Sequence, residues 1–175
     1  MQKMEDGRLA FLNGSFSDAV ESFTDVLQTQ VLSEPIRVNA IRGQLDALLE
    51  LGQAERAREL LQRYLEKTDR PDRRERKAAI LHVYAKYLEL SGEPKAAVKV
   101  LREELSYLSS QYERYYMRLT ENYLQQARLF LDMCELSEAR IYLDLASYCM
   151  NTDGDDLLKA CYYHVEARYL LITRL

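Results

Sequence analysis

Residues 48–65 read LLELGQAERARELLQRYL, and the spacing of small and apolar residues in this stretch indicates the fold of the whole chain. Ala57, Leu61 and Leu65 follow one another at intervals of four residues, which places them on one face of a helix. Gly52 precedes them and can adopt the left-handed conformation that ends a helix. The stretch therefore predicts the end of one helix, a tight turn and the start of a second helix.

The same pattern occurs four times along the chain. The small residue of the second helix recurs at intervals of 38, 40 and 42 residues: Ala19, Ala57, Ala97 and Ala139. A turn residue stands five positions before each of them: Gly14, Gly52, Gly92 and Cys134. A large apolar residue stands four positions after each of them: Phe23, Leu61, Leu101 and Leu143. A mostly small residue of the first helix stands seven positions before each turn residue: Gly7, Leu45, Ala85 and Ala127. Repeats of this length that consist of two helices are typical of helical solenoids.

This arrangement of small residue, turn glycine, alanine and large residue resembles the tetratricopeptide repeat (TPR). The resemblance extends from about Gly7 to the end of the chain. It departs from the family in three ways: the units exceed the usual length of about 34 residues, the proline that usually ends a unit is missing, and Cys134 replaces one turn glycine. Similar stretched repeats occur in kinesin light chains, in bacterial maltose-regulator-like proteins and in peptide-pheromone receptors, and repeat length does not choose among these.

The resemblance implies an all-α fold of about nine helices, arranged as a right-handed superhelical array of antiparallel helix pairs. We expect one repeat domain over residues 1–175, with units at residues 1–33, 34–70, 71–110 and 111–152 and a half-unit at 153–175. Ala167 takes the small position of that half-unit, 40 residues after Ala127. Residues 169–175 are too apolar for a capping helix. We therefore interpret the sequence as a fragment of a longer protein, and the alternative is that this end meets another subunit.

Four local expectations follow from individual residues. Gly43 falls inside the third helix, where it costs about 1 kcal/mol relative to alanine unless another side chain packs on it. The second helix of the third unit is expected at residues 94–109. The next helix, at residues 111–133, is expected to be the longest. In the acidic turn at residues 151–156, Asp155 or Asp156 is expected to cap the last helix.

Composition and charge argue against several classes of function. The 175-residue chain is 47% apolar and 30% charged, which is typical of a folded, helix-rich protein. Its net charge of −4 argues against nucleic acid as a partner, because phosphate binding needs a concentrated basic surface. No apolar run approaches the roughly 18 residues of a membrane span, and the first residues do not resemble a signal peptide. We therefore expect a cytoplasmic location and no direct contact with nucleic acid or membranes.

The sequence contains no recognisable catalytic or metal-binding motif. A glycine-rich phosphate loop, a nucleophile elbow and an HExxH motif are all absent. His82 and His164 occupy the same position in different units, so they are expected to lie far apart. Cys134, Cys149 and Cys161 form no C-x-x-C pair and are expected to be free thiols in a reducing compartment. We therefore predict no enzymatic activity, no metal and no cofactor.

A binding surface is the better candidate for a functional site. The resemblance implies that the first helices line the concave side, with the residue after each small position pointing inward: Arg8, Asp46, Lys86, Arg128 and Arg168. With the neighbouring inward positions, the predicted site comprises Arg8, Phe11, Asn39, Arg42, Asp46, Leu49, His82, Lys86, Glu89, Arg128, Leu131 and Arg168. Bases interrupted by one acid, beside an apolar column, suit a peptide with acidic and apolar side chains. The alternative is that these are ordinary surface charges whose common phase is a coincidence.

These observations predict a protein–protein or peptide interaction module, which would be the sensing or scaffolding part of a larger cytoplasmic signalling or regulatory protein. Two alternatives stay open. One is a structural spacer or a homodimer formed through the exposed C-terminal helix. The other is a regulatory domain of a transcription factor or signalling enzyme whose output domain lies outside this sequence.

Overall fold

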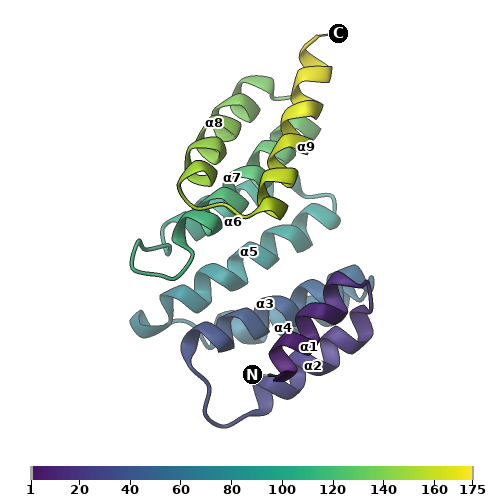
Figure 1. The fold of residues 1–175 in the computed structure, drawn as a ribbon, viewed down its shortest axis with the longest axis vertical. Helices are drawn as coiled ribbons and strands as arrows, with labels where there is room; N and C mark the ends of the chain where they lie inside the picture. The colour runs from purple at the N-terminus through teal and green to yellow at the C-terminus, as the bar shows by residue number, and fades with distance from the viewer. Residues whose placement is uncertain (1, 175) are drawn as a thin grey trace. The chain divides into compact units, whose positions relative to one another are not determined.

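The computed structural model describes residues 2–174, and every regular element in this range is helical (Figure 1). This range contains nine α-helices and a short 3-10 turn, η1 (Pro71–Arg73), so the predicted all-α fold is confirmed. The helices are α1 (Gln2–Leu12), α2 (Phe16–Gln28), α3 (Glu34–Glu50), α4 (Ala54–Glu66), α5 (Arg74–Leu90), α6 (Pro94–Leu105), α7 (Tyr115–Asp132), α8 (Leu136–Thr152) and α9 (Asp156–Thr173).

The chain divides into two compact units. The N-terminal unit, Met1–Ser91, holds α1 to α5, and the C-terminal unit, Gly92–Leu175, holds α6 to α9. In the N-terminal unit, α3 packs against α1, α2, α4 and α5. In the C-terminal unit, α7 packs against α6, α8 and α9. The first helices of successive repeats therefore lie side by side within each unit: α1, α3 and α5 in one, α7 and α9 in the other.

The four turn residues identified in the sequence all have left-handed backbone conformations. Gly14, Gly52 and Gly92 have φ angles of 76°, 70° and 78°, and Cys134 has a φ angle of 58°. After three of these turns the backbone N–H donates to the carbonyl five residues earlier: Ser15 to Ala10 (2.8 Å), Gln53 to Leu48 (3.0 Å) and Glu135 to Phe130 (2.8 Å). This is the hydrogen bond of a helix that ends in a left-handed residue. A β-carbon is unfavourable in this conformation, so Cys134 carries strain that the three glycines avoid.

The predicted small and large positions form the core of each unit. The four alanines of the second helices, Ala19, Ala57, Ala97 and Ala139, are completely buried. The four large residues that follow them, Phe23, Leu61, Leu101 and Leu143, are at most 4% exposed. The small positions of the first helices are buried as well: Gly7, Leu45, Ala85 and Ala127. The repeat phase read from the sequence is therefore the phase of the hydrophobic core.

Gly43 lies against the aromatic ring of Phe23, which explains why the third helix tolerates a glycine. A β-carbon at position 43 would stand 2.5 Å from ring atoms of Phe23. The same ring also contacts Gly7 of α1, where a β-carbon would stand 2.9 Å from it. Phe23 of α2 is thus clamped between two glycines on the neighbouring first helices. The cost in helix propensity at Gly43 is offset by the close packing of this ring.

Two helix boundaries in the C-terminal unit differ from the prediction. Helix α6 ends at Leu105 rather than near residue 109, and α7 begins at Tyr115 rather than at Gln111. The residue before α7, Arg114, has a φ angle of 61°, so a right-handed helix cannot extend through it. Its guanidinium lies 3.8 Å from the carboxylate of Asp155. The expected long helix is therefore shortened by one turn, to a length matched by α9.

Polar side chains are buried between α6 and α7. Asn122 is completely buried, and its amide donates to the Leu101 carbonyl (2.9 Å) and to the Glu104 carboxylate (2.7 Å). The amide of Gln126, also completely buried, donates to Asn122 (2.7 Å). Because buried polar groups are costly without partners, these bonds favour one particular pairing of the two helices.

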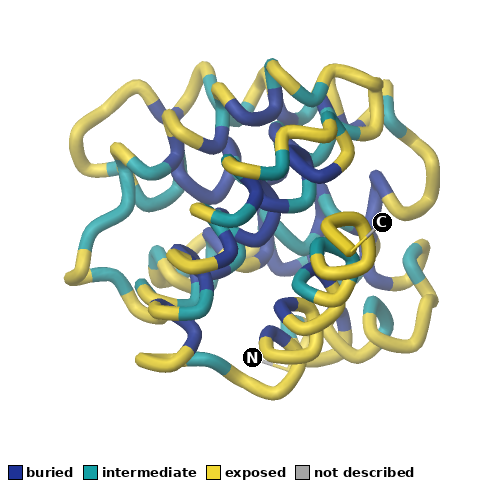
Figure 2. The backbone as a smooth tube through the Cα atoms, turned by 90° about the horizontal axis from the view of Figure 1, so that it is seen from above, coloured by how far each residue is buried: buried dark blue, intermediate teal, exposed yellow. Residues whose placement is uncertain are grey.

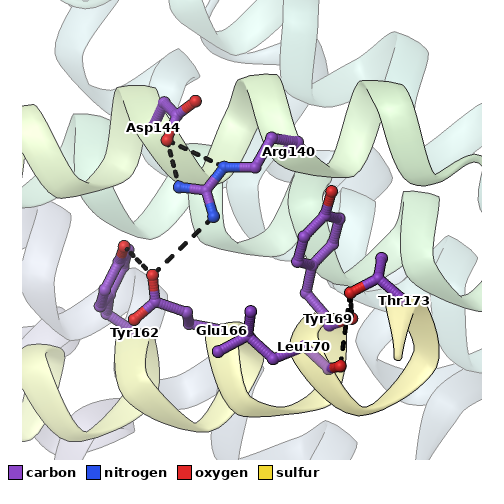
Figure 3. A network of polar contacts seen from close by, with 7 residues as sticks. All are labelled: Arg140, Asp144, Tyr162, Glu166, Tyr169, Leu170 and Thr173. Carbon is purple, nitrogen blue, oxygen red and sulfur yellow. Dashed lines mark hydrogen bonds and ion pairs between the residues drawn. The ribbon is translucent and has the colours of Figure 1, made fainter. Parts of the chain in front are cut away.

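A polar network joins α8 to α9 (Figure 3). Arg140 of α8 is held by Asp144 in its own helix and lies 3.9 Å from Glu166 of α9. The Tyr162 hydroxyl donates to the same Glu166 carboxylate (2.9 Å). The guanidinium of Arg140 also lies 5.5 Å from the centre of the Tyr169 ring. These contacts connect α8 and α9 through partly exposed side chains.

The predicted cap of the last helix is confirmed at Asp155. Its carboxylate accepts a hydrogen bond of 2.8 Å from the backbone N–H of Leu158. This satisfies one of the donors that the first turn of a helix leaves unpaired.

Candidate binding surface

The residues predicted to face a ligand lie on the first helices of the repeats. In the N-terminal unit they are Arg8 and Phe11 on α1, Asn39, Arg42, Asp46 and Leu49 on α3, and His82, Lys86 and Glu89 on α5. In the C-terminal unit they are Arg128 and Leu131 on α7 and Arg168 on α9. We call the solvent-facing part of each set the first-helix surface of that unit.

The structure does not show the apolar column that was predicted on this surface. Leu49 is 6% exposed and Leu131 is 2% exposed, so both belong to the core. Leu49 stands four residues after the fully buried Leu45, and residues four apart share one face of a helix. Phe11 is half-buried and packs edge to face against Phe16, with ring centres 5.3 Å apart. The first-helix surface is therefore polar.

Lys86 is held by two carboxylates of the neighbouring first helix. Its ammonium lies 2.8 Å from Glu50 and 3.5 Å from Asp46, both on α3. Burial lowers the pKa of Lys86, but the two carboxylates raise it by more, so the pKa stays above its usual range. The structure thus brings together Asp46 and Lys86 from the predicted site, as an ion pair between α3 and α5.

The same ion pair recurs in the C-terminal unit. Arg168 of α9 lies 2.7 Å from the carboxylate of Asp132 on α7. In both units the base follows the small position of one first helix, and the acid stands 36 residues earlier, near the end of the preceding first helix. Glu50 and Asp132 were not among the predicted site residues. A pattern in the sequence could have identified them. Glu50 and Asp132 occupy the same position in their repeats, and each stands 36 residues before a base.

Arg8 and Asn39 are the most accessible members of the first-helix surface. Both are exposed, and Arg8 lies 2.8 Å from Glu5 in its own helix, with both side chains more than half exposed. The hydrogen bond from Arg8 lowers the pKa of Glu5, although burial acts in the opposite direction. Exposed pairs of this kind are readily exchanged for another carboxylate. The Asn39 amide offers donors and an acceptor that match a peptide backbone.

No three His, Cys, Asp or Glu side chains among residues 2–174 are placed so that they could hold a metal ion. Among the helices of the same range, none combines the length and the apolar character that crossing a bilayer requires.

Comparison with known proteins identifies the fold. No family model and no curated protein matches this sequence. Among solved structures, the chain is similar to the crystal structure of a putative kinesin light chain from Podospora anserina, described as having nearly identical TPR-like repeats. The TM-score is 0.56 at 20% sequence identity, and the match covers 99% of this chain and 96% of the other. This chain has a TPR-like fold.

The TPR-like fold confirms the resemblance drawn from the repeat pattern, and with it the all-α solenoid class. Kinesin light chains were one of three groups with stretched repeats to which the pattern was similar. At 20% identity the match shows the fold alone.

Proposed function

We propose that this chain is a protein–protein interaction module that binds an extended peptide or a segment of a partner protein on the first-helix surface of its N-terminal unit. The observation that carries the proposal is the packing of α1, α3 and α5 side by side, with small and large apolar residues buried and charged or amide residues outside. Solenoids use surfaces of this kind, spread over several repeats, for binding.

The chemistry of this surface favours a polar ligand. Arg8 and Arg42 supply positive charge on the first two repeats, while Glu50 and Glu89 supply negative charge on the second and third. Because Leu49 is buried, the apolar side chains expected of the ligand would find no apolar column here. We therefore propose a segment that carries acidic side chains toward α1 and whose backbone is held by Asn39, with mixed charge beyond.

The proposed function also includes a role in the cell. A module of this type would serve as the sensing or scaffolding part of a larger signalling or regulatory protein in the cytoplasm. The TPR-like fold supports this role because its surface spans several helices and can hold an extended segment without a catalytic group.

A matched pair of variants tests the proposal. Peptides are first selected against the wild-type chain from a displayed random library, and their affinities are measured by titration. Arg8→Glu is expected to weaken binding by about tenfold, because it replaces an attractive charge with a repulsive one. Arg58→Glu is the control, since Arg58 on α4 forms the same kind of exposed pair with the glutamate three residues earlier, at 2.7 Å.

Equal loss of affinity in the two variants, or no loss in either, would show that α1 is not part of the binding surface. Arg128→Glu tests whether the C-terminal unit contributes to the affinity. If it leaves the affinity unchanged while Arg8→Glu reduces it, the site is confined to the N-terminal unit.

A further inference from the structure

Among residues 2–174, the other helices cover α9 on one side only. Leu158, Tyr162 and Val165 face the rest of the C-terminal unit and are 5–8% exposed. The opposite side carries Ala160, Tyr163, Ala167 and Leu170, which are spaced by three or four residues and therefore share a face. Tyr163 is 60% exposed and Leu170 is 41% exposed. We call these four residues the uncovered α9 face; Figure 2 shows the exposed positions along this helix in yellow, beside the C-terminus.

The residues of this face have the chemistry of a helix contact. Tyr123, Ala127 and Phe130 stand 40 residues earlier, at the same positions of α7. There they are covered by α8, whose Tyr142 ring lies 6.1 Å from Tyr123 and 5.4 Å from Phe130. Ala127 is completely buried in the same hairpin. The uncovered α9 face repeats this tyrosine, alanine and large apolar residue, but no helix within residues 2–174 covers it.

We propose that a second copy of this chain covers the uncovered α9 face, through an antiparallel pairing of the two α9 helices about a two-fold axis near Ala167. An alanine at the crossing lets two helices approach closely, as at Ala127 and Ala139, which are both fully buried in the α7–α8 hairpin. With the axis at Ala167, Tyr163 of each copy lies opposite Leu170 and Leu171 of the other. Ala167 of one copy then meets Ala167 of the other, and the large apolar residues on either side meet each other.

Charge favours the antiparallel direction. Asp156 at the start of α9 and Arg174 after its end are both exposed. An antiparallel pair places Arg174 of one copy over Ala160 of the other, one turn from Asp156. Lys159 already lies 3.5 Å from Asp156, so the carboxylate would be shared between two bases. A parallel pair would instead bring the two Asp156 side chains together and align the helix dipoles unfavourably.

The area available matches a weak but specific dimer. The exposed parts of Tyr163, Leu170 and Leu171, with the alanines and the Arg174 stem, amount to roughly 500 Å² per copy. The two copies together would bury roughly 1,000 Å², which is the lower limit for a specific interface. A dissociation constant of about 1–100 μM is the expected range. This pairing uses none of the residues proposed for peptide binding in the N-terminal unit, so the two proposals can fail independently.

Sedimentation velocity of the chain from about 1 to about 200 μM tests the pairing. The wild type is expected to shift from monomer to dimer across this range. Ala167→Glu, which places two carboxylates at the axis, is expected to raise the dissociation constant by at least about tenfold. Ile141→Glu is the control, because Ile141 is 52% exposed on α8 and the change introduces the same charge on another face. Circular dichroism of each variant confirms that the helices are intact.

Disulfide trapping tests the direction of the two helices. In a background with Cys134 and Cys161 replaced by serine, Ala167→Cys is expected to form a disulfide between copies, because two cysteines must come within about 7 Å. Ala160→Cys is expected not to, since its two copies would be about 20 Å apart along an antiparallel pair. Three results would overturn the pairing. The chain could stay monomeric at about 200 μM, or the dimer could survive Ala167→Glu but not Ile141→Glu. The third is equal disulfide trapping at positions 160 and 167.

Discussion

Replacing Gly43 by alanine gives a clear test of the packing in the N-terminal unit, because two effects predict opposite signs. Gly43 lies within α3, where alanine is a better helix former by about 1 kcal/mol. If helix propensity were the only effect, Gly43→Ala would stabilise the protein. The structure places the new methyl group 2.5 Å from the ring of Phe23, which is closer than two carbon atoms can approach.

The ring has little room to move away from this methyl group. The same ring also lies against Gly7, where a β-carbon would be 2.9 Å from it. Phe23 itself is 4% exposed and belongs to the core of this unit. Overpacking a core usually costs about 1–3 kcal/mol, and the upper end applies where both sides are closed. After the gain of about 1 kcal/mol in helix propensity, Gly43→Ala should destabilise by about 2 kcal/mol.

Urea denaturation followed by circular dichroism measures this free energy, and thermal melting should show a loss of about 4–8 °C. Gly7→Ala should have the same sign and a smaller effect, and Asn39→Ala, at an exposed position one turn earlier on α3, should change stability by less than about 0.5 kcal/mol. Combining Gly43→Ala with Phe23→Leu should recover about 2 kcal/mol relative to the sum of the single changes. An increase in stability for Gly43→Ala would show that the ring does not occupy this position.

Three further predictions concern single residues. Cys134→Gly should stabilise by about 0.5–1 kcal/mol because it relieves the left-handed backbone, while Cys134→Ala should not; denaturation midpoints compare the two. Asp155→Ala should destabilise α9 by about 1 kcal/mol through loss of its cap, measured in the same way, with Asp153→Ala as the control. Lys86→Gln should lower the melting temperature at pH 8. Since the pKa of Lys86 is raised above 10.5, its stabilising contribution is complete below 10.5 and is lost at higher pH, so the difference from wild type should shrink above pH 10.5.

The fold could be predicted because the repeat pattern records steric requirements that recur in each hairpin. A left-handed turn requires glycine or tolerates few other residues, and a close helix crossing requires a small side chain. Gly52 and Ala57 meet these two requirements in residues 48–65. In the structure, Gly52 is left-handed and Ala57 is completely buried. The start of α7 was missed because nothing in the sequence marks Arg114 as a left-handed residue.

The binding surface was less predictable because a helix turns by about 100° per residue. The phase assigned to the first helices placed Lys86 and Asp46 on one surface, where the structure pairs them, but it also placed Leu49 there. Leu49 is in the core, because the first helices are covered over a wide face by neighbours on both sides. The phase gives the side of a helix on which a residue lies, but it does not give the partner of a charged residue. That partner depends on the distance between neighbouring helices.

The recurring ion pairs have a consequence for binding. Lys86 and Arg168 each follow a small position, as a ligand-binding base would, but both are engaged by carboxylates of the preceding first helix. A ligand carboxylate could bind Lys86 only by displacing Glu50, which is held in the same molecule at high effective concentration. Arg8 instead pairs with Glu5 of its own helix, and both side chains are more than half exposed. The position at which an acidic ligand meets the least competition is therefore α1, and affinity for such a ligand should depend more on the first repeat than on the third.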